Sequence, residues 1–237
     1  MSIDFLNRLR LRRDSRDIRL KCCVYFWFRI DRYRALTMAI KTLRIPSYPI
    51  DAQFVERWSP RAFTLDPIDE GTVLTILEAA RWAPSSYNSQ PWRFVCVHRD
   101  TDHWDSFLSF LNDFNRSWAV RAAAIVVVMS KRTFRIPGKD EELSLPTHSF
   151  DAGAAWAFLA LQASLIGWGA HALAGINSDH IRSELSIPDD FSIEACVAVG
   201  RAGDAALLPH FLQPKEVPSD RRPLVDMAAE GRFVDGT

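Results

Sequence analysis

The sequence predicts an α+β fold in which a small mixed or antiparallel sheet is flanked by helices. Long segments with apolar residues at helical spacing alternate with a few short apolar runs of the kind that form strands. No internal repeat and no low-complexity linker divides the part of the chain that carries these segments. We therefore expect one main folded domain, from residue 49 to residue 237, preceded by an N-terminal segment of different composition.

Four helices are expected from residue spacing and end signals. The first begins with Asp66 as its cap and Pro67 in its first turn, and ends before Pro84. Residues 152–166 are apolar nearly all round, which predicts a helix buried on every side, of the kind found at subunit interfaces. A short amphipathic helix ends before Pro188. Apolar residues three or four positions apart define the inner faces of the first helix and of one further helix: Val73, Ile76, Leu77 and Ala80, and Trp104, Phe107, Leu108 and Leu111.

Short apolar runs predict the strands. They lie at residues 94–97, 124–129, 169–173 and 193–199. From Leu207 to Pro223 the chain has four prolines and no periodicity, so we expect it to run extended over a surface before a last short helix.

Composition excludes several classes of partner. The 29 Lys and Arg balance 29 Asp and Glu, which gives no electrostatic reason to expect nucleic acid or an anionic membrane. The four cysteines fit neither a disulfide framework nor a zinc site, and the six histidines are scattered, so we expect no metal and a reducing, cytoplasmic location. The nucleotide-binding and hydrolase motifs with regular glycine spacing are missing from the sequence, which leaves a small ligand as the expected partner.

Residues 1–48 form a basic extension, with 12 Lys and Arg against four Asp. Their apolar run, Cys22 to Phe28, is shorter than the roughly 20 residues that span a bilayer, so we expect no membrane span. The extension is expected to be poorly ordered. It is either an anchor or targeting arm, or an over-extended start with a truer beginning near Met38.

Two polar clusters are the candidate functional residues. In the first, residues 57–63, two arginines flank a hydroxyl and can converge on one anion, although arginines before a helix also often form a plain solvated surface. The second, residues 84–92, is a polar loop with a proline at each end and a tryptophan after it. Its amide and hydroxyl groups can satisfy the many donors and acceptors of a flavin.

The two clusters together carry a family resemblance. R-x-S-x-R-x-F at residues 57–63, followed after a helix by A-P-S-S-x-N-x-Q-P-W at residues 83–92, resembles the nitroreductase family of FMN-dependent enzymes. The resemblance extends from about Val55 to Val225. It implies a nitroreductase-like homodimer with FMN at the subunit interface and the extended C-terminal segment wrapped around the partner. The cofactor-binding residues that it implies are Arg57, Trp58, Ser59, Arg61, Pro84, Ser85, Ser86, Asn88, Gln90, Asn115, Ala174, Gly175 and Arg221.

The resemblance also implies a role for most of these positions. Arg57 and Ser59 lie on the phosphate side, and Arg61 lies near N1 and O2 of the ring. The second cluster, with Pro84, Ser85, Ser86 and Asn88, faces the flavin of the other subunit.

Further positions match the family in order along the chain. Asn115 is similar to a ring-contacting amide, and Ala174 with Gly175 is similar to a turn whose backbone N–H approaches flavin N5. Gly200 ends a strand as in the family, and Arg221, which we favour over Arg222, returns to the phosphate.

Two positions depart from the family pattern. Trp118 stands where some members have a lysine over the flavin, and Ala174 where some have a glutamate. These departures bear on redox potential and on substrate preference.

The implied activity is a ping-pong oxidoreduction. NAD(P)H passes hydride to N5 of FMN, and a nitroaromatic, quinone or related small electrophile then takes it from the same face, with no obligatory catalytic side chain. The loop from Lys131 to Ser149, with Phe134 and His148, is the expected acceptor-shaping segment, or else a plain solvated loop.

Three alternatives remain open at this stage. The first is a specialised flavin enzyme that dehalogenates, dehydrogenates or breaks down flavin. The second is a flavin-binding or sensing protein without turnover. The third is a helical binding module in which the clusters are coincidental.

Overall fold

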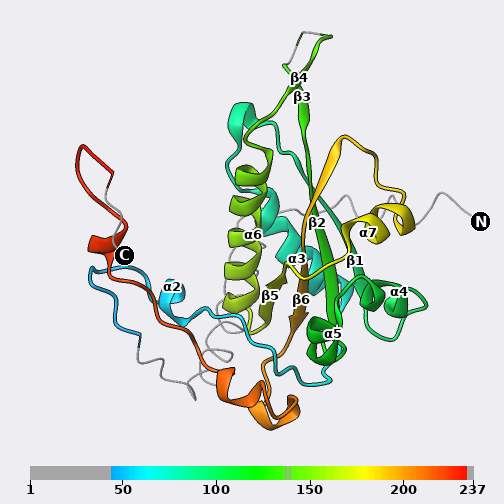
Figure 1. Cartoon of the computed structure of the whole chain (residues 1–237), viewed down its shortest axis with the longest axis vertical. Helices are drawn as coiled ribbons and strands as arrows, with labels where there is room; N and C mark the ends of the chain where they lie inside the picture. The colour runs from blue at the N-terminus through cyan, green and yellow to red at the C-terminus, as the bar shows by residue number, and fades with distance from the viewer. Residues whose placement is uncertain (1–43, 137, 139, 234–237) are drawn as a thin grey trace, which may run out of the picture. The chain divides into compact units, whose positions relative to one another are not determined.

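A four-stranded sheet in the order β1-β2-β6-β5 forms the centre of the computed structural model, which describes residues 44–136, 138 and 140–233 (Figure 1). Contacts divide the chain into Met1–Lys41 and Thr42–Thr237, and all described residues belong to the second unit. Most of the basic extension lies outside the described residues. All three strand pairings are antiparallel, which confirms the expected α+β class. The four strands are β1 Trp92–His98, β2 Ala124–Lys131, β5 Gly169–Leu173 and β6 Phe191–Gly200.

Both faces of the sheet are covered by helices because the central strands are apolar on both sides. In β2, Ile125, Val127 and Met129 enter one hydrophobic core, whereas Val126 and Val128 enter the other. The first core also contains buried residues of α4 Trp104–Ser109, α5 Asp113–Ala119 and α7 Ser178–Glu184. The second contains those of α3 Glu70–Arg81 and α6 His148–Leu165 (Figure 1).

Three expected elements are corrected in detail. Helix α3 is capped by Asp69 rather than Asp66, because Asp69 accepts from both the backbone N–H and the hydroxyl of Thr72, at 2.8 and 2.7 Å. Strand β1 is an edge strand in which Trp92 and Val97 are buried and the other five residues are not, so it is not a fully buried strand. The expected loop after β2 contains a hairpin, β3 Thr133–Arg135 paired with β4 Glu142–Ser144.

Helix α6 is not buried on every side within this chain. Its small residues Ala155 and Ala163 are buried in the core that α3 and the sheet share, but Phe150 is 80% exposed and Leu165 is 50% exposed. An apolar surface of this kind on a long helix is typical of a contact with another chain.

Arg44, the first described residue, lies beside the segment that follows β6, since Arg44 Nη1 donates to the backbone oxygen of Ser219 at 3.5 Å (Figure 1). The segment after β6 contains only single 3-10 turns, so the expected last helix is one such turn, at Leu224–Asp226. No helix in the described part of the chain is both long and apolar enough to cross a membrane.

Candidate functional site

The first polar cluster lies against one end of the sheet, where two glycines allow its close approach. Gly169 of β5 pairs with Gly200 of β6. A Cβ atom on Gly169 would come within 2.4 Å of the Pro60 ring, and one on Gly200 within 2.7 Å of the Phe63 ring. Both positions therefore need glycine so that segment 57–63 can pack on the strand ends.

The C-terminal segment holds this cluster by its backbone. One carboxylate oxygen of Glu216 accepts from the N–H groups of Arg61 and Ala62, at 2.7 and 2.8 Å. Leu212, four residues earlier, is fully buried in the core. The cluster and the C-terminal segment are thus joined as one site.

Three arginines from three separate segments gather on the outer side of the cluster. Arg57 Nη1 donates to the Ser59 hydroxyl at 3.3 Å, and Arg44 Nη2 donates to the Arg57 backbone oxygen at 3.2 Å. Burial, together with the Arg221 and Arg44 guanidiniums, lowers the pKa of Arg57. Burial and Arg221 likewise lower the pKa of Arg44, against a weaker opposite effect of Asp220.

This arginine cluster (Arg44, Arg57 and Arg221) favours an anionic ligand. Positive charges held together repel one another, and Asp220, an exposed carboxylate, offsets this for Arg44 only in part. Arg44 was not among the residues expected from the sequence. The signal that could have drawn attention to it is weak, because it is one of 12 basic residues in a segment assigned to an extension.

His171 and Trp118 connect the first polar cluster to α5 by direct contacts. His171 on β5 donates through Nδ1 to the Pro60 backbone oxygen at 3.1 Å, and its ring lies 4.8 Å from that of Trp118. Burial, and then the Arg61 guanidinium, lowers the pKa of His171, so its ring is neutral at physiological pH. Trp118 is buried in the core against Phe63, beneath the site.

Asn115 and Gly175, both expected from the sequence, are in direct contact. The Asn115 side-chain amide donates to the Gly175 backbone oxygen at 3.2 Å, and the Asn112 N–H donates to the same oxygen at 3.0 Å. A Cβ atom on Gly175 would come within 2.4 Å of the Asn112 amide nitrogen. Ala174, just before, is exposed, and its backbone oxygen accepts from Ile176 in a tight turn.

The second polar cluster is a rigid loop with an exposed polar face. The Ser86 N–H donates to the buried carboxylate of Asp151 on α6 at 3.2 Å, and the Gln90 N–H donates to the Ser85 hydroxyl at 3.0 Å. Tyr87, Asn88 and Gln90 all have positive φ, between 47° and 53°. Such strain in residues other than glycine is typical of binding loops. Pro84, Asn88 and Gln90 face outward.

The two clusters lie at opposite ends of the sheet. The first packs on the paired Gly169 and Gly200, at the end of the sheet where β2 begins with Ala124. The second leads into Trp92, which pairs with Ser130 near the other end of β2. From Ala124 to Ser130 a strand spans about 20 Å. One ring system cannot contact both clusters of the same chain at this separation.

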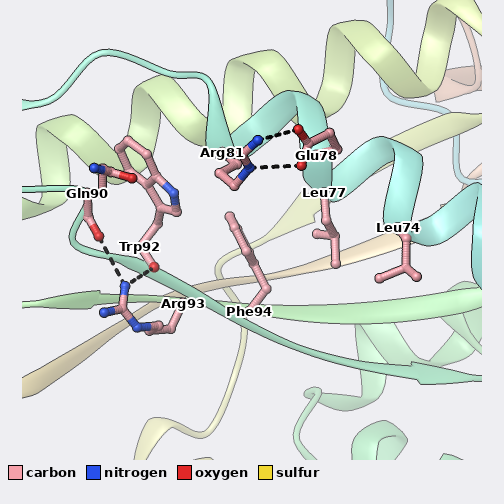
Figure 2. Close-up of a pocket in the computed structure, with 8 residues that line it drawn as sticks. All are labelled: Leu74, Leu77, Glu78, Arg81, Gln90, Trp92, Arg93 and Phe94. Atoms are coloured by element: carbon pink, nitrogen blue, oxygen red, sulfur yellow. Dashed lines mark hydrogen bonds and ion pairs between the residues drawn. The ribbon is translucent and has the colours of Figure 1, made fainter. Parts of the chain in front are cut away.

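The described surface has two cavities beside the second cluster. The larger, about 450 Å³, is a groove between α3 and β1 (Figure 2). Figure 2 shows Leu77 and Phe94 lining it beneath the ion pair of Arg81 and Glu78, and hydrogen bonds from Arg81 and Trp82 lower the pKa of Glu78 to about 2. The smaller cavity, about 320 Å³, lies between the second cluster and the β3–β4 hairpin.

The expected acceptor-shaping residues behave differently from each other. Phe134 on β3 stacks on Tyr87, with ring centroids 5.2 Å apart, and lines the smaller cavity. His148 instead contacts the buried Ser130 hydroxyl through Nδ1 at 2.7 Å, and Ser130 also donates to Glu194. His148 is therefore held within the fold and does not line this cavity.

The fold and the arginine cluster define a protein that suits a small anionic ligand, and comparison with known proteins gives the family. The model of the nitroreductase family matches residues 54–201. An NADH dehydrogenase of Thermus thermophilus is 26% identical over 190 residues, 69% of this chain and 91% of that protein. A solved structure described as the oxidoreductase containing FMN is 47% identical with a TM-score of 0.79, and the match covers 84% of this chain and 100% of that one.

The chain belongs to the nitroreductase family. A further relative, the 5,6-dimethylbenzimidazole synthase of Rhodospirillum rubrum, is 56% identical over 48 residues, which are 20% of this chain and 23% of that protein.

The residues present fit FMN. Arg61 Nε and Trp118 Nε1 are buried donors without a partner among the described residues, and the ring of a flavin presents acceptor atoms. The arginine cluster suits a phosphate, because guanidiniums bind phosphate oxygens through several hydrogen bonds.

Proposed function

We propose that this protein is an FMN-dependent oxidoreductase that takes hydride from NAD(P)H and passes it to a nitroaromatic, quinone or related small electrophile. The observation that carries the proposal is the convergence of Arg44, Arg57 and Arg221 beside a partnerless Arg61 Nε. FMN, when bound, would supply N5 as the atom that accepts and returns hydride in a ping-pong cycle.

The chain's own residues bind and orient. Arg57, Ser59 and Arg221 hold the phosphate, and the Glu216 carboxylate keeps the backbone of Arg61 in place. The Arg61 guanidinium, whose Nε is buried without a partner among the described residues, would supply positive charge at the pyrimidine edge of bound FMN. No side chain acts as an obligatory acid or base.

Asn115 and the turn at Ala174 and Gly175 would hold the ring of FMN. Asn115 is fixed by its own hydrogen bond to Gly175, so its position is set before a ligand arrives. No described backbone oxygen accepts from the Gly175 N–H, which leaves this donor available to N5.

We propose a homodimer, with the second cluster of one chain completing the site of the other. The separation of the two clusters along β2 supports this arrangement, as does the exposed apolar surface on α6 and on the C-terminal segment. The C-terminal segment would then wrap the partner. The cytoplasmic location expected from the cysteine pattern remains a prediction.

An anaerobic visible spectrum of the FMN-reconstituted protein tests the redox proposal. We expect the flavin absorbance to appear on binding and to bleach on addition of NADPH or NADH. Flavin that binds but stays oxidised with both donors would overturn the reductase function, and a protein that binds no FMN would overturn the cofactor assignment too.

Subunit complementation tests the shared site. Arg57→Gln removes a phosphate-binding group from the first cluster, and Asn88→Ala removes a polar group from the second cluster. If each site uses both chains, a mixed dimer of the two variants has one intact site, and about a quarter of the sites in a random mixture regain FMN reduction. No recovery in a verified mixed dimer would contradict the shared site.

A second candidate is specialised flavin chemistry, and the local match to a 5,6-dimethylbenzimidazole synthase favours it. That name describes synthesis of an aromatic product rather than reduction of an acceptor. Slow NAD(P)H oxidation with every ordinary acceptor, although the flavin bleaches, would favour this candidate over the first.

A further inference from the structure

The β3–β4 hairpin and the second polar cluster enclose a cavity with features of a binding site. Its volume, about 320 Å³, lies at the lower end of the roughly 300–1,000 Å³ typical of small-molecule sites. Its lining includes the rings of Tyr87 and Phe134 and the charged side chains of Arg93, Lys131, Arg135 and Glu142.

The charge of this cavity is positive. It is lined by three cations and one carboxylate. The carboxylate, Glu142, is already bound by Lys131 at 2.9 Å and by the Thr133 hydroxyl at 2.6 Å, and Lys131 also reaches Asp190 at 3.4 Å. The two carboxylates outweigh the single charge of Lys131, so Lys131 adds no net positive charge to the cavity.

Arg93 and Arg135 carry the remaining positive charge. Arg93 Nη1 donates to the backbone oxygens of Gln90 and Trp92, at 3.0 and 2.7 Å, which fixes its guanidinium at the wall that the cavity shares with the neighbouring groove (Figure 2). Arg135 pairs with Glu142 across the hairpin, and its charge adds to the hydrogen bonds of Thr133 and Lys131 in lowering the pKa of Glu142, but Glu142 forms its hydrogen bonds with Thr133 and Lys131. Both arginines are exposed, so an entering anion can reach them.

The cavity also offers an aromatic surface. Tyr87 and Phe134 are stacked with an angle of 26° between their planes, and Tyr87 is 75% exposed. A planar ring can extend such a stack, which typically strengthens binding by a factor of about 2–10 beyond burial of its area.

The loop that carries Tyr87 is held in place before any ligand arrives. Its backbone is fixed through Ser85 and Asp151, despite the positive φ of Tyr87, Asn88 and Gln90. A loop held in a strained conformation by several hydrogen bonds loses little further entropy on binding.

We propose that this cavity is the acceptor subsite and that it selects planar aromatic acceptors with a negatively charged substituent, such as a carboxylate. The ring lies on the Tyr87–Phe134 stack and the anion on Arg135 and Arg93. This inference deepens the proposed function and depends on it, because the cavity is formed by the same loop that completes the partner's flavin site in that proposal.

A pair of acceptors of nearly the same shape tests the charge preference. In the FMN-reconstituted protein, we expect kcat/KM for 4-nitrobenzoate to exceed that for 4-nitrobenzamide. Arg135→Gln should lower kcat/KM for the benzoate about tenfold, as for loss of one charge-assisted hydrogen bond, and change that for the benzamide less than twofold. Equal losses for both acceptors, or a wild-type preference for the benzamide, would overturn the proposal.

Two further variants separate charge from shape. Phe134→Leu removes the ring and should lower kcat/KM for both acceptors by a similar factor of about 2–10. Glu141→Gln neutralises a charge on the same hairpin outside the cavity lining, so it should not lower kcat/KM for 4-nitrobenzoate. A loss of benzoate activity in Glu141→Gln comparable to that in Arg135→Gln would show a general effect of the hairpin and contradict the proposal.

Direct binding distinguishes failure of the subsite from failure of the proposed function. Calorimetric titration of the FMN-reconstituted protein with benzoate should show binding that Arg135→Gln weakens about tenfold, and weaker binding of benzamide. If NADPH does not bleach the flavin, the proposed function fails while the titration still decides the subsite. If the flavin bleaches but benzoate and benzamide bind alike, the subsite alone fails.

Discussion

Glu216 and Arg61, 155 positions apart in the sequence, are joined by a hydrogen bond of 2.7 Å from the Arg61 N–H to the Glu216 carboxylate. The same oxygen accepts from Ala62, so the carboxylate holds two successive backbone donors. This contact sets the backbone of the first polar cluster from a distant segment.

Loss of the Glu216 carboxylate should loosen the site. Glu216→Ala leaves the N–H groups of Arg61 and Ala62 without their acceptor, and we expect a fall of about 1.5–3 kcal/mol in the free energy of unfolding, with weaker FMN binding. Urea denaturation and flavin titration measure both. Glu216→Gln keeps one acceptor oxygen and should recover part of the stability and part of the FMN affinity. The control Glu230→Ala, at an exposed position, should have a free energy of unfolding within about 0.5 kcal/mol of wild type.

The contribution of Arg44 to phosphate binding should appear as discrimination between flavins. Arg44→Gln removes one cation from the arginine cluster, so we expect the Kd of FMN to rise about tenfold and that of riboflavin, which lacks the phosphate, to change little. Fluorescence titration with both ligands measures this difference.

Two further variants test whether the charge of Arg44 is responsible. Arg44→Lys keeps the charge and should recover part of the affinity, and Arg232→Gln serves as an exposed control. Equal weakening of FMN and riboflavin by Arg44→Gln would show that Arg44 acts only on the local structure.

Gly175 should not accept a side chain. The Cβ atom of Gly175→Ala would lie 2.4 Å from the Asn112 amide nitrogen and 2.6 Å from that of Asn115, so both amides must move. We expect a loss of about 1–3 kcal/mol in stability, together with clearly weaker FMN binding. In Gly153→Ala, where nothing lies within 4 Å, stability should be unchanged or rise by up to about 1 kcal/mol. Normal FMN affinity in Gly175→Ala would contradict the role of this turn.

His171 should make the fold sensitive to mild acid. Its pKa in the folded protein is lowered from the usual value near 6.5, so protonation favours the unfolded state. Its contribution to stability is therefore present above pH 6.5 and is lost as the pH falls through 6.5 toward the folded-state pKa.

Melting temperatures at pH 7.5 and pH 5 measure the effect of His171. We expect a smaller drop in His171→Gln, which keeps a donor for Pro60, than in wild type. The exposed His210→Gln variant should behave as wild type. Identical drops in all three proteins would show that His171 does not titrate in this range.

Strand positions were largely predictable because they depend on local apolar runs. Residues 94–97, 124–129 and 193–199 lie within observed strands, and 169–173 coincides with β5. The start of α3 was wrong because Asp66 and Asp69 are both good caps, and only the hydrogen bonds to Thr72 decide between them.

The site was predictable where it is formed by contiguous motifs. The segments around Arg57 and Ser85 could be recognised from side-chain types over a few residues. Arg44 and Glu216 carry no such local signal, since each acquires its role only from contacts with Arg57, Arg61 and Ala62 across the fold.

The sequence by itself determined the α+β class, the order of the elements and the two polar clusters, because these follow from periodicity and from residue types within short windows. The tertiary structure decided that the clusters lie at opposite ends of β2, that the hairpin closes a cavity over Tyr87, and that Glu216 holds the backbone of Arg61. Strand register and contacts between distant segments depend on how the whole chain packs. The register and the contacts that form are those that leave few buried polar groups unpaired across the whole fold, and no local pattern in the sequence specifies that outcome.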